Sequence, residues 1–298
     1  MPDTPIQITL VRERKAQSLG PELRLLIERT LSILNFSDSA GRELIHLTER
    51  EGIAVVTLDR PPVNAFDDDH QQQLDVAITE IQRSSARAVL IRSASAIFSA
   101  GADIAMIANR LADPDPGDRM AAFATGLQKT FNRIAALRVP SVAEIVGVAA
   151  GGGLELALAC DVRIAGASAR LGLPEVTIGL LPGAGGTQRV TQAVGRSQAL
   201  RLLLTGDLVD AHHALQWGLV QEVAPDEELA ERCGHLVAQL ALVPATLSES
   251  IKACVDLVPD EQGFTAEIDA TRQLCDDPIT AIRVRSFLDR KTRSGGKR

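Results

Sequence analysis

The chain has 298 residues, of which 45% are apolar and 23% are charged. This composition is close to the globular average, so it excludes a wholly disordered chain, a collagen and a coiled-coil rod. The formal net charge is −7, which argues against a general nucleic-acid binder, because neutralising phosphates needs a net positive surface. Aromatic residues make up only 3%, with no Tyr, so a surface for stacking single-stranded bases is also poorly supplied.

The cysteines and the apolar runs indicate the compartment. The 4 cysteines lie far apart without a Cys-x-x-Cys pair, which is typical of reduced intracellular thiols and not of a zinc site. No uninterrupted apolar run reaches the roughly 18 residues of a membrane span. The N-terminal residues also lack the apolar stretch of a signal peptide. We therefore expect a cytoplasmic protein with no metal site and no nucleic-acid or membrane partner.

The start of the chain differs from the remainder. Apolar residues over 23–34 recur at helical spacing, and a polar break follows over 37–41. We predict that residues 1–42 form an N-terminal extension with one helix, which either covers exposed core or binds a partner. The main domain is expected over 43–242, and a helical C-terminal region over 243–298.

Strand and helix patterns alternate through the main domain. Short β-rich runs predict strands over 44–48, 53–58, 88–91, 142–148 and 162–165, the first two joined as a hairpin. Helical spacing predicts helices over 70–83, 120–137, 187–194, 197–204, 227–242 and 246–257. Strands that alternate with helices are typical of an α/β fold.

Three segments are rich in small residues, at 98–104, 151–157 and 181–187. The first follows a predicted strand, and its small residues allow close approach of a ligand to the backbone, with Asp103 able to cap the next turn. The second opens a helix, so its free N–H groups and the positive end of the helix dipole suit a phosphate or an oxyanion. No segment matches G-x-G-x-x-G or the P-loop pattern, so a nucleotide-binding fold is not expected.

Two carboxylates lie near these segments. Glu155 is in the first turn of the helix that the second glycine segment opens, and Glu175 follows Pro174. Each has an ordinary structural interpretation, Glu155 as a partner of the helix dipole and Glu175 as a surface cap after proline. In apolar surroundings beside free amides, the same pair suits general acid–base chemistry on a carbonyl compound.

The glycine segments and both glutamates resemble the crotonase superfamily, the enoyl-CoA hydratase/isomerase family. The resemblance covers about 43–293 and is carried by 98–104, 151–157 with 160–161, 174–175 with Gly179, 182–189, 58–65 and 214–220. It implies an α/β spiral of ββα turns with a helical C-terminal trimerisation region. A homotrimer or a dimer of trimers is therefore expected.

The resemblance also implies an activity. The substrate would be an acyl-CoA thioester, with no separate cofactor because coenzyme A is part of the substrate. The oxyanion amides fall on Ala102 and Gly152, Glu155 acts chiefly as the base toward water, and Glu175 donates a proton to the α-carbon. Family isomerases commonly manage with one acid/base group, so keeping both glutamates favours a 2-enoyl-CoA hydratase.

The expected substrate and coenzyme A contacts are Ala100, Asp103, Ile104, Met106, Phe287 and Arg290. The last two lie in a run over 287–291 that resembles the family's C-terminal aromatic–basic run. Ile107 and Phe123 are expected to line an apolar acyl pocket. Glu144 is a third carboxylate, at a place where many relatives are neutral, and we expect it to be structural or exposed.

Two alternatives remain open. One is a double-bond isomerase, or another crotonase-type lyase, on the same scaffold. The other is a non-enzymatic scaffold or RNA-binding relative, against which the acidic charge and the two glutamates argue.

Overall fold

The computed structural model describes residues 42–257 and six single positions beyond them: Thr265, Ile268, Asp269, Thr271, Thr280 and Ile282. Residues 1–41, which hold the predicted N-terminal helix, lie outside the described residues. The expected coenzyme A contacts Phe287 and Arg290 do so as well.

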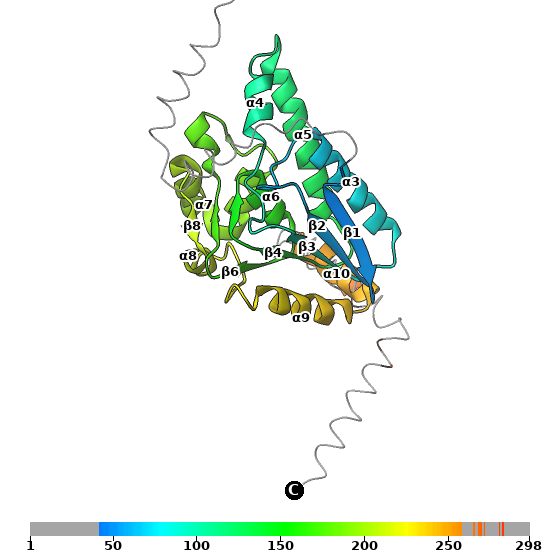
Figure 1. Ribbon diagram of the computed structural model, residues 1–298. Helices are drawn as coiled ribbons and strands as arrows, with labels where there is room; N and C mark the ends of the chain where they lie inside the picture. The colour runs from blue at the N-terminus through cyan, green and yellow to red at the C-terminus, as the bar shows by residue number, and fades with distance from the viewer. Residues whose placement is uncertain are drawn as a thin grey trace, which may run out of the picture.

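The larger of two sheets within residues 42–257 has six strands (Figure 1). Their order is β1 (Ile45–Arg50), β2 (Ile53–Leu58), β3 (Ala88–Ser93), β4 (Ser141–Ile145), β6 (Val162–Gly166) and β9 (Glu222–Ala224). β1 and β2 pair antiparallel, with Ile45 opposite Leu58, so the predicted hairpin is confirmed. Every other neighbouring pair in this sheet is parallel.

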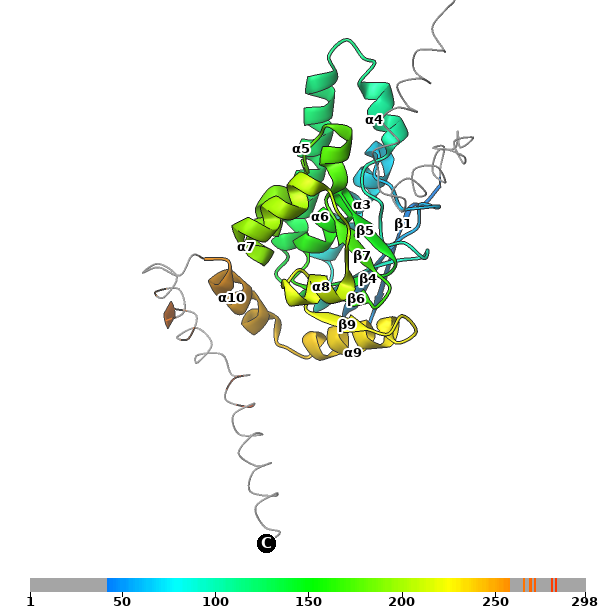
Figure 2. The same ribbon diagram turned by 90° about the vertical axis from the view of Figure 1, so that its left-hand side faces the viewer.

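Both faces of this sheet are covered, which explains why its strands read as continuous apolar runs. On β3, Val89 and Ile91 join one buried cluster, whereas Ala88 and Leu90 join another. The first cluster packs under α3 (Asp68–Arg83), α5 (Pro116–Ala135) and α6 (Gly152–Ala159). The second packs under α9 (Leu229–Ala241), as Figures 1 and 2 show. The predicted α/β class is confirmed.

The predicted strand over 142–148 is two strands. β4 ends at Ile145, and β5 (Val148–Ala150) belongs to a second sheet with β7 (Arg170–Gly172) and β8 (Val209–Asp210). Gly147 makes the break, because its φ of 60° is left-handed and a Cβ there would lie 2.1 Å from the carbonyl oxygen of Ala96. The bend carries the chain from one sheet to the other, and α6 follows β5.

The other described elements surround these layers. They are α4 (Ile104–Arg110), the 3₁₀-helix η1 (Pro174–Ile178), α7 (Gly186–Thr205), α8 (Ala211–Gln216) and α10 (Ala245–Val255). α7 is interrupted at Gly195, where φ is 73° and ψ is 162°, so the predicted division into two helices is confirmed. α5 begins earlier than predicted because Pro116 is well suited to the first turn of a helix. Among the described residues, every helix is too short or too polar to cross a bilayer.

A buried asparagine ties the β2–α3 connection to the first glycine segment. Asn64 is fully buried, with φ at 49°. Its Nδ2 donates to the carbonyl oxygens of Phe98 (3.0 Å) and Ile97 (3.1 Å), and its Oδ1 accepts from the Arg60 amide (2.8 Å). The Ser99 hydroxyl donates to the Asn64 carbonyl at 2.7 Å. These bonds fix the backbone that leads into residues 98–104.

We expect Asn64→Ala to lower the free energy of unfolding by about 3 kcal/mol, since each buried polar group left without a partner costs ~1–3 kcal/mol. Loss of the asparagine also removes a residue type that tolerates positive φ. Urea denaturation measures the change. Asn109→Ala, at an exposed position of α4, is the matched control and should stay within ~0.5 kcal/mol of wild type. Equal stability of the Asn64→Ala variant and wild type would contradict this account.

Candidate active site

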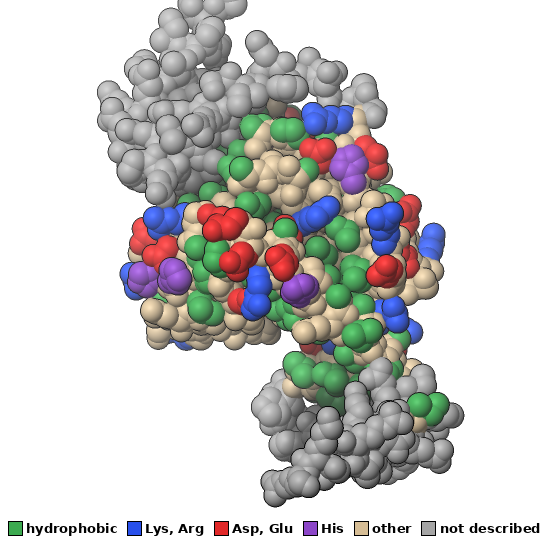
Figure 3. Space-filling view, turned by 60° about the horizontal axis from the view of Figure 1, so that its bottom comes forward, with side chains coloured by type: hydrophobic (Ala, Val, Ile, Leu, Met, Phe, Trp, Pro, Cys, Tyr) green, Lys and Arg blue, Asp and Glu red, His purple; other side chains and the backbone are tan. Residues whose placement is uncertain are grey.

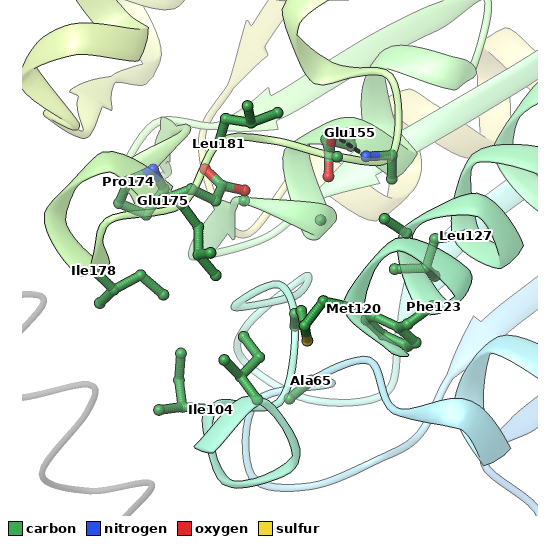
Figure 4. Close-up of a pocket in the computed structure, with 18 of the residues that line it drawn as sticks. Ala65, Ile104, Met120, Phe123, Leu127, Glu155, Pro174, Glu175, Ile178 and Leu181 are labelled. Atoms are coloured by element: carbon green, nitrogen blue, oxygen red, sulfur yellow. Dashed lines mark hydrogen bonds between the residues drawn. The ribbon is translucent and has the colours of Figure 1, made fainter. Parts of the chain in front are cut away.

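A cavity of about 550 Å³ lies among α4, α5, α6 and η1 (Figure 4). Most of its wall is apolar, and the larger apolar side chains are Ile104, Met120, Phe123, Leu127, Ile178 and Leu181. Glu155 and Glu175 also line it, and Figure 4 shows the two carboxylates on one side of the cavity. An apolar pocket with a few convergent polar groups is the usual form of a small-molecule site.

Glu155 lies in the first turn of α6 and is only 2% exposed. Its Oε1 accepts two hydrogen bonds, from the amides of Ala184 (2.8 Å) and Gly186 (2.7 Å). Because both bonds end on Oε1, Oε2 is the oxygen left to face the cavity. Burial raises the pKa of Glu155 to about 6, against the opposing effect of the two amides and of the Arg189 charge.

Glu175 lies on η1 and reaches over the start of α6. A Cβ placed on Gly151 would lie 2.7 Å from Glu175 Oε1, so the carboxylate occupies the space beside that glycine. Its Oε2 is buried and has no hydrogen-bond partner within the described part of the chain. Burial first, and then the negative charge of Glu155, raise the pKa of Glu175 to about 8.

The two carboxyl groups therefore differ in protonation state. Near neutral pH Glu155 is ionised and Glu175 keeps its proton, because burial and then the charge of Glu155 raise the pKa of Glu175, whereas two amides and Arg189 oppose the effect of burial on Glu155. One group can then accept a proton while the other donates one, which is the pattern expected of an acid–base pair.

The first and second glycine segments meet backbone to backbone beside this pair. A Cβ on Gly101, whose φ is 93°, would lie 3.0 Å from the Gly152 nitrogen. A Cβ on Gly152 would lie 3.7 Å from the Ala102 nitrogen, so the two amides are neighbours. The Phe66 amide donates to the Gly101 carbonyl, and the Asp103 amide donates to the Phe66 carbonyl, which leaves the amide between them unused.

The amides of Ala102 and Gly152 donate to no acceptor among the described residues, and both residues line the cavity. Gly152 is also the first residue of α6, where the helix dipole adds positive potential. Two free amides side by side at the wall of an apolar cavity are suited to stabilise a developing oxyanion. The four residues expected to be catalytic, Ala102, Gly152, Glu155 and Glu175, thus line one cavity.

Other expected contacts divide between the cavity and the surface. Ala100, Ile104, Ile107 and Phe123 line the cavity, as predicted.

Asp103 and Met106, predicted to contact substrate, are not part of its lining. Asp103 Oδ1 caps α4 by accepting from the amides of Ala105 (2.8 Å) and Met106 (3.1 Å), and Oδ2 accepts from Arg60 Nη2 (2.8 Å). The helical turn that this cap starts directs Met106 to a separate surface hollow beside Asp67 and Arg110.

Glu144 lies outside the cavity and is buried on β4, so the structural alternative holds for it. Burial raises the pKa of Glu144, and its charge acts on Cys233 of α9, on the opposite side of the sheet from α6.

The third glycine segment has a role that the sequence did not reveal, since it supplies the amides that bind Glu155. A glycine turn that opens a helix was visible in the sequence, but its partner was not.

Comparison with known proteins gives the family. Residues 48–291 match the model of the family described as enoyl-CoA hydratase/isomerase. The chain belongs to the enoyl-CoA hydratase/isomerase family. It is 35% identical over 216 residues to "Probable enoyl-CoA hydratase echA8" of Mycobacterium tuberculosis, covering 72% of this chain and 81% of that protein.

Two further similar proteins, one of them a solved structure, come from other organisms. The chain is 35% identical over 221 residues to "Probable enoyl-CoA hydratase, mitochondrial" of Dictyostelium discoideum, covering 72% of this chain and 77% of that protein. The structure of Pseudomonas aeruginosa DspI superposes with a TM-score of 0.78 at 32% identity, covering 87% of this chain and 97% of that chain. The fold of this family member is therefore crotonase-like, as the sequence predicted.

The raised pKa of Glu175 predicts a pH-dependent cost in stability. The folded value of about 8 lies above the ordinary 4.5, so between these values the folded state holds a proton that the unfolded state has lost, and stability falls as pH rises. Glu175→Gln removes this titration. We expect the variant to be close to wild type below about pH 4.5 and more stable than wild type above about pH 8.

Urea denaturation at the two ends of this pH range measures the difference. Glu80→Gln, at an exposed position of α3, is the matched control and should show no pH-dependent gain. A Glu175→Gln variant whose stability relative to wild type is the same at both pH values would contradict the pKa shift.

Proposed function

We propose that this family member is an enoyl-CoA hydratase that adds water syn to a 2-enoyl-CoA thioester. The observation that carries the proposal is the pair of buried carboxylates, Glu155 and Glu175, whose pKa values are raised to about 6 and about 8 at one wall of the cavity. Adding water across a double bond needs a base for water and an acid for the neighbouring carbon, which this pair supplies.

The proposed reaction balances in protons and electrons. The ionised Glu155 takes a proton from water, and the water oxygen forms a bond to C3 of the enoyl group. The π electrons move toward the thioester, whose oxygen becomes an enolate held by the amides of Ala102 and Gly152. Glu175 then gives its proton to C2. Return of the proton from Glu155 to Glu175, directly or through solvent, restores the starting state.

The alternative is double-bond isomerisation, in which one proton leaves one carbon and returns to another. A single acid/base group suffices for that reaction, and a second buried carboxylate would add only desolvation cost. The two differently protonated carboxyls therefore favour hydration over isomerisation.

The apolar wall supports an apolar acyl group. Besides the two glutamates, Thr177 is the only residue with a polar side chain among the described cavity-lining positions. No separate cofactor enters the proposed reaction, since coenzyme A arrives with the substrate.

A homotrimer or a dimer of trimers, in the cytoplasm, is also part of the proposal. Figure 3 shows charged side chains over α9 and hydrophobic ones toward α10. Leu242, Ile251 and Val255 in this region are 69%, 51% and 75% exposed, which supports burial of this end of the chain by another copy.

Turnover of crotonyl-CoA tests the proposal. Loss of the conjugated thioester absorbance should be at least ~100-fold slower in Glu155→Gln than in wild type, the size expected for removing an acid–base group. Glu144→Gln is the matched control, because Glu144 is a buried carboxylate outside the cavity, and it should keep wild-type turnover. Unchanged hydration by Glu155→Gln would remove the reason for proposing this reaction.

The same assay with a 3-enoyl-CoA tests the isomerase alternative. The wild-type protein should turn over the 2-enoyl thioester faster than the 3-enoyl thioester. Faster conversion of the 3-enoyl thioester would replace hydration with isomerisation, and no turnover of either would overturn the proposed function.

A further inference from the structure

The carboxylate of Glu155 is held by a loop, residues 182–186, that joins η1 to α7. Both of its hydrogen bonds come from this loop, from the amides of Ala184 and Gly186, and Ala184 is only 1% exposed. No side chain of the described residues bonds to Glu155. The conformation of the loop therefore decides where the free oxygen of Glu155 points.

Arg189, in the first turn of α7, holds this loop through its guanidinium group. Its Nη1 donates to the Ala184 carbonyl at 2.9 Å, and its Nη2 donates to Asn132 Oδ1 on α5. A Cβ on Gly185, whose φ is 102°, would lie 2.2 Å from Arg189 Nη1, so the guanidinium fills the space that a side chain at that position would take. The peptide between the two donors to Glu155 is thereby fixed to α5.

The charge of Arg189 has no direct acidic partner in the described part of the chain. Both side-chain contacts are to neutral oxygens, and Arg189 forms no ion pair among the described residues. Arginine is rarely removed from water without a paired acid. Here the half-buried charge acts through space on Glu155, where it lowers the pKa and partly offsets the effect of burial.

We propose that Arg189 is a positioning residue for Glu155, which aims the carboxylate by holding residues 182–186 between α6 and α5. This inference rests on the proposed function for its kinetic test, but not for its spectroscopic test. The Arg189 side chain is absent from the described cavity lining, so it acts on the cavity through Ala184 and the loop.

The charged groups that act on Glu155 come from two elements. The charge interaction between Glu155 and Glu175 on η1 favours the protonated form of the pair, whereas Arg189 on α7 lowers the pKa of Glu155. α6 has no other charged side chain, and β5 has none. On α5, the nearby Arg133 is paired with Asp75 of α3. Removing Arg189 therefore leaves the carboxyl pair without its one opposing cation among the described residues.

Three variants separate the loop contact from the charge. Arg189→Gln removes the charge, Arg189→Lys keeps the charge but loses the planar two-point contact, and Asn132→Ala removes only the exposed anchor of the guanidinium. Arg196→Gln is the matched control, because Arg196 is an exposed arginine of the same helix. Circular dichroism and urea denaturation first establish that each variant is folded.

The first readout is the pH dependence of crotonyl-CoA hydration. Arg189→Gln should lower kcat about 10- to 100-fold with little change in KM, the size expected for a misaimed catalytic group. The acidic limb of its kcat/KM profile should move to higher pH, because the ionised form of Glu155 is less favoured. Arg189→Lys should restore the limb but only part of kcat, and Asn132→Ala should show a smaller loss in the same direction.

The second readout does not depend on turnover. Carbon-13 NMR of labelled glutamate carboxyls, with Glu155 assigned through Glu155→Gln, follows the titration of the free protein. The pKa of Glu155 should rise in Arg189→Gln and stay at its wild-type value in Arg196→Gln.

Wild-type titration of Glu155 in Arg189→Gln, or wild-type kcat with a change in KM or stability alone, would overturn the inference. If wild type hydrates no enoyl-CoA, the proposed function fails while the NMR titration still decides the role of Arg189. If Arg189→Gln does not fold, the titration and kinetics of Asn132→Ala decide it by the same criteria.

Discussion

Two carboxyl groups withdrawn from water at one wall of a cavity are the constraint on which this molecule depends. Burial disfavours the charge on each, and the charge of Glu155 also disfavours a charge on Glu175. The protein gives the two carboxyl groups different surroundings. It gives Glu155 two amide donors and a nearby cation, and gives Glu175 Oε2 no hydrogen-bond partner among the described residues. The inequality makes one group a base and its neighbour an acid.

The fold supplies this inequality through its backbone. α6 begins where β5 leaves the second sheet, so its first turn presents the Gly152 amide and Glu155 to the same cavity. The network around Asn64 fixes the first glycine segment against that turn, and the loop before α7 reaches Glu155 from the other side. Main-chain groups are suited to such positioning because they carry no rotamer freedom, which makes them preorganised donors. Glycine recurs at these contacts because the segments approach at distances that a Cβ would block.

How much of this could be read from the sequence depended on whether the relevant signal was local. The hairpin, the alternation of strands and helices, the break in α7 at Gly195 and the oxyanion-type helix start all have local patterns, and the structure contains each of them. The cavity likewise brings together Glu155 and Glu175, which are far apart in local structure but carry the family pattern.

The features that were missed depend on contacts between distant segments. The single strand predicted over 142–148 divides because Gly147 abuts Ala96, a contact that no periodicity reveals. Asp103 and Met106, which were expected at the substrate, lie outside the cavity lining, and Asp103 caps α4 instead. Arg189 ends the run 182–189 that carries the family resemblance, but its role was missed because that role depends on a loop carbonyl and on α5.

A crystal structure of the protein with a bound saturated acyl-CoA tests the central claim most directly. The account predicts the thioester oxygen at roughly 2.7–3.1 Å from the nitrogens of both Ala102 and Gly152, the distance expected of oxyanion donors. The carbons next to the thioester should face Glu155 and Glu175. A thioester bound away from these two amides, or with its acyl carbons turned from both carboxyl groups, would contradict the account.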